Sequence, residues 1–427
     1  MESDIFRILH GLPLLQKNKN DNNKKNIYII GGGWGCASFI KHIDTDKYNV
    51  HVISKEDNFL YTSLLAQNIT KNVNLEQNLK NINNKIIFER NEVIDVDFNS
   101  NTIITLQPDT EDKVNQVQKE LVTHGIDSKC DRSHSIPLKP NKIIKYDYII
   151  FSHGSEINTF NISGVQKYCQ FLKNNNSANN IKNKLKDLPE NSNIAVIGLG
   201  LTGSEIIGHL IDSNQKKFNI YAIDGLNRPL TLFTPSISSY VTNIWQKNNI
   251  HVKVNTFVKS IDKNNICISQ NNNALETINY DLAIWAGGVK ISGLSQIINK
   301  KLNSDCKFGI NVDKYLAIPN TKNSYAIGDC SYNKPHNSII ANPPTAQVAY
   351  QQGKYLAKKF NNPSNIEPYK FDNKGQICYI GGFNSVYQNN YFTSSGRITY
   401  YLNKIIHVYN AINYKQMINI IKGDSRK

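Results

Sequence analysis

The chain has 427 residues, of which 40% are hydrophobic, 10% aromatic and 19% charged, so it is long enough for about two to three globular domains with full cores. Its formal net charge of +15 is compatible with nucleic acid, an anionic membrane surface or an anionic small ligand as a partner. The basic residues are scattered, and no Lys/Arg block is interleaved with aromatic residues, which argues against nucleic acid.

The seven cysteines form no CxxC pair and no metal-site spacing, which is typical of a reducing compartment and predicts no metal site. No apolar run approaches the roughly 18 residues that a membrane-spanning helix needs. The first segment, MESDIFRILHGLPLLQKNK, is short, amphipathic and basic, but Glu2 and Asp4 are atypical of a mitochondrial transit peptide.

The first predicted motif is NIYIIGGGWGCASFI, residues 26–40, in which a strand runs through a glycine turn into a helix. Such a turn binds the phosphates of a dinucleotide at the helix N-terminus, and a carboxylate after the next strand binds a ribose hydroxyl. The next strand is YNVHVIS, and Cys36 stands where the pattern has glycine or alanine, so we expect looser helix packing. The residues predicted to contact this dinucleotide are Gly31, Gly33, Trp34, Gly35 and Glu56, the last of which lies 20 residues beyond Cys36.

The second motif is NIAVIGLGLTGSEIIGHL, residues 193–210, which contains Gly198, Gly200 and Gly203. The strand FNIYAID ends in Asp224, 21 residues after the last of these glycines. A carboxylate there accepts from a ribose 2′-hydroxyl and repels a 2′-phosphate, which favours NADH over NADPH. The nearby Arg228 is the one feature that favours NADPH instead. The alternative interpretation of the whole motif is a glycine-rich turn that binds no ligand.

Two such turns predict two dinucleotides, and a flavin with a nicotinamide can pass hydride where two nicotinamides cannot. A late strand, SYAIGDCS, ends in Gly328 and Asp329, where two-dinucleotide flavoproteins hold the flavin's ribityl chain. The helix predicted in PPTAQVAYQQGKYLAKKF then directs its N-terminus at the flavin and stabilises the negative charge of the reduced ring. Pro343 and Pro344 are expected in its first turn.

The carboxyl end has an apolar repeat of three or four residues, interrupted by basic and polar residues on the opposite face. This pattern predicts an amphipathic helix that lies on an anionic bilayer surface. The alternative is a helix that docks on the protein's own core or on a second subunit. The apolar residues are Ile398, Leu402, Ile405, Tyr409 and Ile412, and the opposite face contains Arg397, Lys404, His407 and Asn410.

Over about residues 26–415 the chain resembles the type II (alternative) NADH:quinone dehydrogenases, which are single-chain, non-pumping respiratory flavoenzymes. Besides the two glycine turns and YAIGDC, the resemblance rests on NFLYTSLLAQ, GSEINTFNISGVQKYCQFLK, YDLAIWAGG, PPTAQVAYQQGKYLAKKF and KGQICYIGG. It implies FAD at the first turn, NADH at the second, a ubiquinone-type acceptor and a homodimer. It further implies a peripheral position on the mitochondrial inner membrane.

The fold implied is α/β, with two Rossmann-like dinucleotide-binding domains of the glutathione-reductase type and a C-terminal amphipathic, membrane-associating helical segment. The predicted FAD domain comprises residues 25–160 and 310–360, and the NADH domain comprises residues 161–309. Residues 361–427 form the predicted quinone-side and dimerisation segment. The polar residues 107–142 have no assigned role.

The resemblance also implies roles for single residues. Glu205 matches a family glutamate near the nicotinamide–flavin contact, although Thr202-x-x-Glu205 is also a helix capping box. Gln347 and Gln351 match the quinone-side helix, share a face at i,i+4 and have Tyr350 beside them. An exposed polar helix face is the alternative.

Two further features support the family pattern, and two residues depart from it. Ala346, with Ala349, indicates packing against a flat group, and Asp329 matches the flavin-holding aspartate. Ser63 stands where the family usually has proline, and Glu56 where it often has a basic residue.

The expected reaction is hydride transfer from NADH to FAD, followed by transfer of two electrons to quinone near Gln347, Tyr350 and Gln351. Two other flavoproteins share this architecture. A sulfide:quinone oxidoreductase would need cysteines beside the flavin, for which Cys169 and Cys330 are the plausible pair. An apoptosis-inducing-factor-like protein would bind NADH with little quinone turnover. The helix after the first turn lacks the CxxxxC pair of disulfide reductases.

Overall fold

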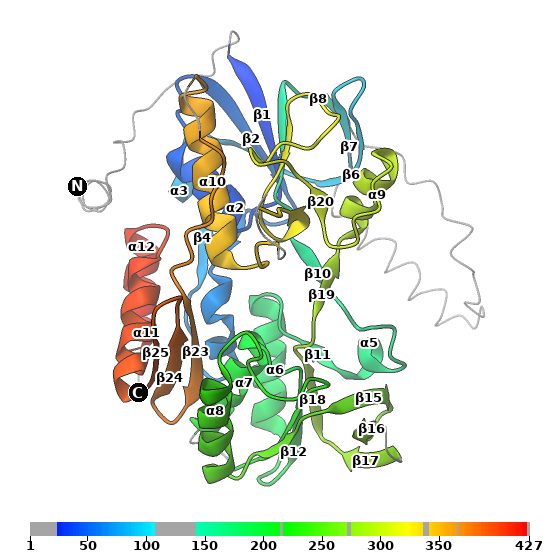
Figure 1. The fold of residues 1–427 in the computed structure, drawn as a ribbon, viewed down its shortest axis with the longest axis vertical. Helices are drawn as coiled ribbons and strands as arrows, with labels where there is room; N and C mark the ends of the chain where they lie inside the picture. The colour runs from blue at the N-terminus through cyan, green and yellow to red at the C-terminus, as the bar shows by residue number, and fades with distance from the viewer. Residues whose placement is uncertain are drawn as a thin grey trace. The chain divides into compact units, whose positions relative to one another are not determined.

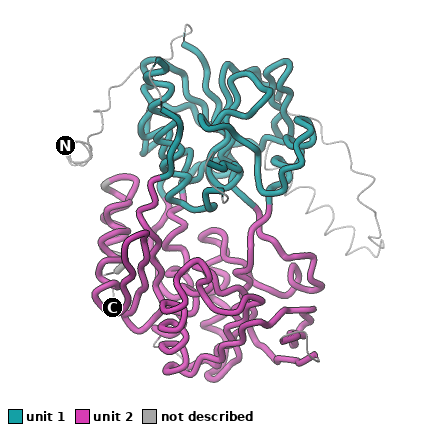
Figure 2. Tube along the Cα trace, viewed as in Figure 1, with its two compact units in different colours: residues 1–59, 77–155, 291–371 teal, residues 60–76, 156–290, 372–427 magenta. Residues whose placement is uncertain are grey.

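The computed structural model describes residues 24–106, 142–213, 217–270, 275–335, 341–364 and 367–424. The N-terminal segment and residues 107–141 considered above lie outside the described residues. The chain divides into two compact units (Figure 2). Unit 1 comprises residues 1–59, 77–155 and 291–371, and unit 2 comprises residues 60–76, 156–290 and 372–427.

Unit 1 is built on a five-stranded parallel sheet in the order β21-β9-β1-β2-β5. The first strand lies in the middle, so the chain adds strands on one side and then on the other, which creates a topological switch point at its carboxyl end. The strands are apolar because helices cover parallel sheets on both faces. They are β1 (Lys25–Ile30), β2 (Tyr48–Ser54), β5 (Ile87–Arg90), β9 (Tyr148–Phe151) and β21 (Ser324–Ala326).

Two long helices of unit 1, α2 (Trp34–His42) and α10 (Ala346–Asn361), pack closely against each other (Figure 1). A Cβ on Gly353 of α10 would lie 2.2 Å from the carbonyl oxygen of Gly35, so the two backbones touch. The other elements are α3 (Leu79–Ile82), α9 (Gly293–Lys301), η2 (Gly328–Cys330), β20 (Ile310–Asn311), β22 (Ser331–Tyr332) and an antiparallel sheet of β6 (Glu92–Asp97), β7 (Thr102–Leu106) and β8 (Lys142–Lys145).

Unit 2 repeats this plan with a parallel sheet in the order β11-β18-β12-β13-β14. Its first long strand again lies in the middle, and an antiparallel sheet again precedes the return to the centre. The parallel strands are β11 (Gln170–Phe171), β12 (Asn193–Ile197), β13 (Asn219–Ile223), β14 (His251–Lys253) and β18 (Leu282–Trp285). The antiparallel strands are β15 (Thr256–Ile261), β16 (Asn265–Gln270) and β17 (Leu275–Asn279).

The helices of unit 2 are η1 (Thr62–Ile69), α5 (Val165–Tyr168), α6 (Asn175–Asp187), α7 (Leu201–Ile211), α8 (Pro235–Lys247), α11 (Arg397–Tyr409) and α12 (Tyr414–Asp424). Beside α11 lies an antiparallel sheet of β23 (Gln376–Gly381), β24 (Asn384–Gln388) and β25 (Thr393–Gly396) (Figure 1). Four short strands are β3 (Asn58–Leu60), β4 (Glu76–Asn78), β10 (Ser155–Ile157) and β19 (Val289–Ile291).

The predicted α/β fold with two Rossmann-like sheets is confirmed. The predicted domain limits were drawn by ligand, and they stay predictions. In the division into compact units, residues 291–309 belong to unit 1 and residues 372–427 belong to unit 2. No helix in the described ranges combines the length and the apolar character that crossing a membrane requires.

The C-terminal helix is present, but the predicted stripe is wrong in part. α11 ends at Tyr409, and Ile412 lies beyond the helix and is buried. Ile398, Ile405 and Tyr409 are exposed. On the opposite face, which we expected to be basic, Arg397 and Asn410 are exposed and Lys404 is half-buried. The same face buries other polar residues against the hairpin of β24 and β25 and against Tyr61. These buried residues are Thr399, Asn403 and His407.

Candidate functional site

The two glycine turns have the same backbone geometry. The nitrogen of Gly31 donates a 2.8 Å hydrogen bond to the carbonyl oxygen of Ile53, and that of Gly198 donates a 2.8 Å bond to Ile223. Both glycines have positive φ, 102° and 96°. A Cβ would lie 2.5 Å from the Ser152 carbonyl oxygen in the first turn and 2.6 Å from a backbone nitrogen in the second. Only glycine therefore fits either position.

The second glycine of each motif borders open space. Gly33 and Gly200 are the N-caps of α2 and α7, and neither helix has a side-chain cap. A Cβ on either residue would meet no atom within 4 Å. The uncapped first-turn N–H groups and the positive end of the helix dipole therefore suit a phosphate group at both turns.

The third position of the motif differs between the turns. A Cβ on Gly203 would lie 1.8 Å from the Gly198 carbonyl oxygen, so α7 touches its own turn. Cys36 occupies the matching position in α2 and is fully buried. In α2 the close approach is made by Gly35, whose Cβ would lie 2.8 Å from Ser152 Oγ. Gly35 thus packs against protein on that side, and its contact with a cofactor stays a prediction.

Asp224 follows β13 and is half-buried beside the second turn. Its Oδ2 accepts a 2.6 Å hydrogen bond from the Leu199 nitrogen, and its Oδ1 accepts a 2.8 Å bond from Leu226. The Arg228 guanidinium is turned elsewhere and donates to the carbonyl oxygens of Phe233 and Thr231 and to the hydroxyl of Ser238. The cation that favoured NADPH is therefore engaged within the protein.

The register of the first sheet places a different residue where unit 2 has Asp224. Ile53 corresponds to Ile223, since both accept from the first glycine of their turn, so the next residue is Ser54. A Cβ on Gly32 would lie 3.3 Å from Ser54 Oγ, which places this hydroxyl beside the turn. Glu56 lies two residues further along the chain and is exposed. The sequence prediction placed the ribose-binding residue by its distance from Cys36 and so chose Glu56. The last residue of the predicted strand YNVHVIS is Ser54, so the strand end would have indicated this residue instead.

Gly328 and Asp329 lie in η2, directly after β21. The Gly328 nitrogen donates a 2.7 Å hydrogen bond to Gln352 Oε1 of α10. Burial raises the pKa of the Asp329 carboxyl, and its hydrogen bond with the Ser155 hydroxyl partly opposes this shift. Gln352 and Ser155 hold this turn in place. Neither was predicted, because no local pattern distinguishes them from neighbouring polar residues.

The helix α10 begins at Ala346, and Thr345 is its N-cap, with a hydroxyl that accepts from the Val348 nitrogen. The expectation that Pro343 and Pro344 form the first turn is therefore wrong, because the threonine hydroxyl satisfies an otherwise unpaired N–H group and sets the helix start. The four predicted site residues on this helix are all half-buried. They are Ala346, Gln347, Tyr350 and Gln351.

Two aromatic residues predicted from separate motifs meet in unit 1. The rings of Trp34 and Tyr350 have centroids 6.5 Å apart at an angle of 73°. The Tyr350 ring also lies 5.9 Å from His42, and its carbonyl oxygen accepts a 2.7 Å bond from Ser38 Oγ of α2. Phe59 stacks edge-on against Trp34 at 4.9 Å. An aromatic cluster thus lies beside the first glycine turn.

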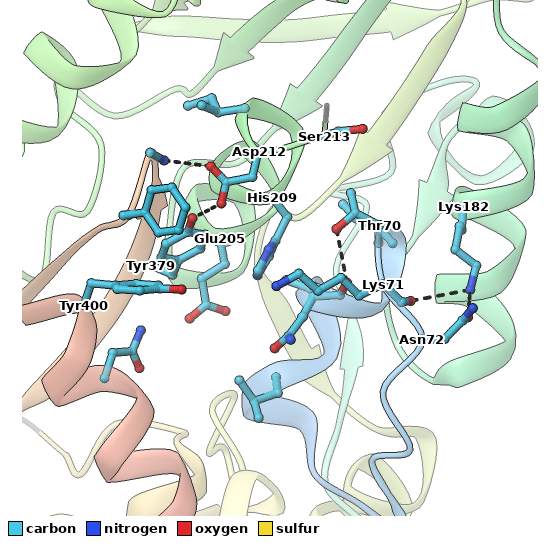
Figure 3. A pocket seen from close by; sticks show the side chains of 18 of the residues that line it. Thr70, Lys71, Asn72, Lys182, Glu205, His209, Asp212, Ser213, Tyr379 and Tyr400 are labelled. Carbon is cyan, nitrogen blue, oxygen red and sulfur yellow. Dashed lines mark hydrogen bonds between the residues drawn. The ribbon is translucent and has the colours of Figure 1, made fainter. Parts of the chain in front are cut away.

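Glu205 lies on α7 and lines a cavity of about 790 Å³ within unit 2 (Figure 3). The N-cap of α7 is Gly200, so Thr202 lies inside the helix and the predicted capping box is wrong. Within the part of the chain that the structure describes, the Glu205 carboxyl has no hydrogen-bond partner. Burial raises its pKa to about 8. One turn later, burial and the charge of Lys71 lower the pKa of His209 to about 3.

The two cysteines considered for sulfide chemistry are buried. Cys169 belongs to the core of unit 2, and the Cys330 thiol of unit 1 donates to the carbonyl oxygens of Phe151 and Ile327. Burial raises the pKa of each thiol to about 12. A reactive cysteine needs an accessible, readily ionised thiol, so neither residue has this character.

Comparison with known proteins identifies the family. Residues 25–353 match the model of the pyridine nucleotide-disulphide oxidoreductases. The chain belongs to this family. As in the sequence prediction, α2 carries a single cysteine, Cys36, in place of a redox-active pair.

This member of the oxidoreductase family is similar to mitochondrial proteins of fungi. It is 28% identical over 401 residues to a probable mitochondrial NADH-ubiquinone oxidoreductase of Schizosaccharomyces pombe. The matched region covers 85% of this chain and 67% of that relative. It is 28% identical over 387 residues to the external NADH-ubiquinone oxidoreductase 2 of Saccharomyces cerevisiae mitochondria, over 83% of this chain and 65% of the relative. The matched region thus spans about two thirds of each relative's length.

A solved structure of NDH2 from Plasmodium falciparum in complex with NADH has the same fold. The TM-score is 0.81 at 24% sequence identity, and the superposition covers 94% of this chain and 97% of that chain. At this identity the likeness bears on the fold alone.

Proposed function

We propose that the chain is a single-chain, non-pumping NADH:quinone oxidoreductase that uses FAD. The observation that carries this proposal is the pair of glycine turns with one geometry, the second of which lies beside Asp224 while Arg228 is engaged elsewhere. The names of the fungal relatives support the same activity. The buried thiols of Cys169 and Cys330 speak against a sulfide-oxidising enzyme.

Unit 1 holds FAD and unit 2 holds NADH in this proposal. The Gly31–Gly33 turn and the N-terminus of α2 bind the FAD pyrophosphate, and Ser54 or Glu56 binds the ribose. Asp329 holds the ribityl chain, and α10 presents its N-terminal turn, with Ala346, to the flavin ring. When bound, FAD accepts hydride from NADH and passes electrons to quinone.

The remaining site residues act on the substrates. Asp224 accepts a hydrogen bond from the NADH ribose, and the turn from Gly198 to Gly203 binds its pyrophosphate. Glu205 is assigned to the nicotinamide side. Gln347 and Gln351 donate hydrogen bonds to quinone oxygens, and Tyr350 offers its ring to the quinone. Trp34, whose ring lies edge-on to that of Tyr350, is assigned to FAD.

The test is anaerobic addition of NADH to the purified, FAD-loaded protein, followed by a short-chain ubiquinone, while the flavin absorbance is recorded. We expect bleaching by NADH and recovery with quinone. Flavin that stays reduced after quinone addition favours the apoptosis-inducing-factor-like alternative. Bleaching by sulfide and not by NADH favours the sulfide:quinone oxidoreductase. A colourless polypeptide that takes up no FAD contradicts all three.

We further propose a homodimer that lies peripherally on the mitochondrial inner membrane through α11. Ile398, Ile405 and Tyr409 are 84%, 65% and 72% exposed and lie on one side of this helix. Apolar side chains gathered on one helix face mark an interaction surface. Removing the helix is no clean test, because its other face is buried in unit 2.

The experiment therefore replaces side chains. We expect Ile398→Ser with Ile405→Ser to weaken flotation with vesicles containing anionic lipid, whereas the control Ile143→Ser, which alters a residue 67% exposed in unit 1, leaves flotation unchanged. Light scattering measures the oligomeric state of the same proteins. If the α11 variant becomes monomeric and still floats, the face is a subunit contact and its assignment to the membrane is wrong.

A further inference from the structure

The cavity that Glu205 lines lies entirely within unit 2. Its walls are the end of η1 with the following residues, the helices α6 and α7, and the C-terminal hairpin with α11. In Figure 3, Lys71 and Lys182 lie on the opposite side of His209 from Asp212 and Tyr379. With a volume of about 790 Å³ the cavity is in the range of small-molecule sites.

The charges around this cavity favour an anion. Its four lysines come from three different segments. Asp212 is engaged, since its carboxylate accepts from the Gly382 nitrogen at 2.8 Å and from the Tyr379 hydroxyl. Glu205 is protonated below its pKa of about 8 and carries little charge at neutral pH. The lysines are Lys71, Lys182, Lys186 and Lys404.

One lysine is built into the wall and not merely exposed at its rim. Lys182 of α6 is only 8% exposed, and its Nζ donates to Asn72 Oδ1 and, at 3.5 Å, to the Lys71 carbonyl oxygen. Burial and the charge of Lys186 lower its pKa. A buried ammonium beside a second lysine is costly, and a bound anion would offset that cost.

The cavity also contains a buried acceptor without a donor. Asn403 is 6% exposed, and its Nδ2 donates a 3.2 Å bond to Ser385 Oγ, whereas its Oδ1 is buried and has no partner in the described part of the chain. A buried amide oxygen requires a hydrogen-bond donor. A ligand hydroxyl would supply one, whereas a fully deprotonated phosphate monoester would not.

Apolar and aromatic groups complete the lining. The Tyr379 and Tyr400 rings are 5.6 Å apart, and Phe383 stacks edge-on against Tyr400 at 5.6 Å. Such surfaces suit the uncharged part of an amphipathic molecule. The helix α11 contributes Asn403 and Lys404 to the cavity and presents Ile398 and Ile405 on its outer side.

We propose that this cavity binds the head group of an anionic phospholipid that carries a hydroxyl group beyond its phosphate. Glu205, which we assign to the nicotinamide side, borders the cavity and is not part of the head-group site. The lysines bind the phosphate, Asn403 Oδ1 accepts from the head-group hydroxyl, and the aromatic wall contacts the glycerol backbone. The choice of a membrane lipid as the ligand rests on the proposed membrane position of α11. If α11 lies on the bilayer, its outer side contacts the membrane while its inner side borders the cavity.

The test uses the full-length, FAD-loaded protein and short-chain lipids kept monomeric, so that binding does not depend on a membrane. Titration calorimetry compares dihexanoyl phosphatidylglycerol with dihexanoyl phosphatidic acid, dihexanoyl phosphatidylcholine and inorganic phosphate. We expect saturable binding of the phosphatidylglycerol at one site per chain. Phosphatidic acid, which lacks the head-group hydroxyl, should bind more weakly, and the zwitterionic lipid and free phosphate more weakly still.

Variants locate the site. Lys71→Gln with Lys404→Gln should weaken phosphatidylglycerol binding about tenfold or more, because two charge-assisted contacts are lost. The control Lys263→Gln makes the same charge change in the exposed turn between β15 and β16, outside the cavity lining, and should leave binding unchanged. Asn403→Leu should remove the preference for phosphatidylglycerol over phosphatidic acid. If this variant fails to fold, the preference of the unaltered protein between the two lipids still tests the hydroxyl contact.

Several results overturn the proposal. These are equal binding of the anionic and zwitterionic lipids, unchanged affinity in the double lysine variant, or complete displacement by inorganic phosphate at equal concentration. Binding of the monomeric lipid without flotation on vesicles supports the cavity site and contradicts the membrane position of α11. A failure of NADH to reduce the flavin contradicts the proposed activity independently of either result.

Discussion

The carboxylate of Asp224 and the backbone nitrogen of Leu199 are joined by a hydrogen bond of 2.6 Å. Leu199 lies between Gly198 and Gly200, so the residue that we propose selects the ribose is tied to the loop that we propose holds the phosphates. The carboxylate is thereby oriented before the coenzyme arrives, which lowers the cost of ordering it on binding. Arg228 is held away by three hydrogen bonds.

The first prediction concerns coenzyme choice. Asp224→Ala should lower kcat/KM for NADH about ten- to a hundredfold, because a hydrogen bond to a charged group contributes roughly 1.5–3 kcal/mol. The kcat/KM for NADPH should change much less, because the substitution also removes the repulsion between the carboxylate and the 2′-phosphate of NADPH. Steady-state kinetics with both coenzymes measures this, with Glu276→Gln, an exposed carboxylate of β17, as the control. An equal loss with both coenzymes would show that Asp224 only supports the turn.

The second prediction separates structural from ligand-facing glycines in the first turn. Gly31→Val should destabilise the FAD-free protein by several kcal/mol, because φ is positive and the new Cβ would lie 2.5 Å from a carbonyl oxygen. Gly33→Val should lower the free energy of unfolding by at most about 1 kcal/mol, because its side chain enters open space. It should still abolish retention of FAD, because that space is where we propose that the pyrophosphate binds. Denaturant unfolding of the FAD-free protein and the flavin content after purification measure the two effects. Retention of FAD by Gly33→Val would contradict the assignment.

The third prediction is a pH dependence of stability from Glu205. Its pKa is about 8 in the folded protein against an ordinary value of 4.5, so the folded state binds the proton more tightly. The resulting stabilisation is complete below pH 4.5 and is lost as the pH rises through 8. The free energy of unfolding of the unaltered protein relative to Glu205→Gln should therefore fall across this interval, by at most about 1.4 kcal/mol per pH unit. Urea unfolding of both proteins at a series of pH values measures the difference, and parallel curves would contradict the raised pKa.

The fourth prediction concerns thiol reactivity. Cys267 and Cys306 are partly exposed, whereas four other cysteines are buried. Iodoacetamide at pH 8 should therefore modify the first two and spare the buried thiols until the protein is denatured, because alkylation needs an accessible thiolate. Peptide mass spectrometry reads the pattern. Rapid labelling of Cys169 or Cys330 in the native protein would restore the sulfide-oxidising alternative. The buried cysteines are Cys36, Cys169, Cys330 and Cys378.

Short-range patterns predicted the architecture well. The strands YNVHVIS and FNIYAID and both glycine turns lie where the sequence indicates them, since apolar strands and glycines with positive φ are local requirements of the chain. Helix starts were predicted less well. Gly200 and Thr345 cap their helices, although Thr202 and Pro344 carry the stronger sequence signals, because packing of the helix decides which of several possible caps is used.

The C-terminal helix illustrates a different limit. Its hydrophobic period predicted a helix but not which face is inward. In the folded protein Thr399, Asn403 and His407 are buried, whereas Ile398 and Ile405 are exposed. Hydrogen bonds from Tyr61 to His407 and from Asn403 to Ser385 compensate the burial of the polar face. Such partners lie far away in sequence, so no periodicity could indicate them.

The sequence by itself determined the two sheets, the turns at their carboxyl ends and the family, because strand formation and glycine conformation depend on neighbouring residues. Only the tertiary structure decided that Arg228 turns inward, that Ser54 occupies the position of Asp224 in the first sheet, and that four lysines line one cavity with Asn403. Register and burial arise from contacts between distant segments, and the free energy of those contacts is absent from any local pattern.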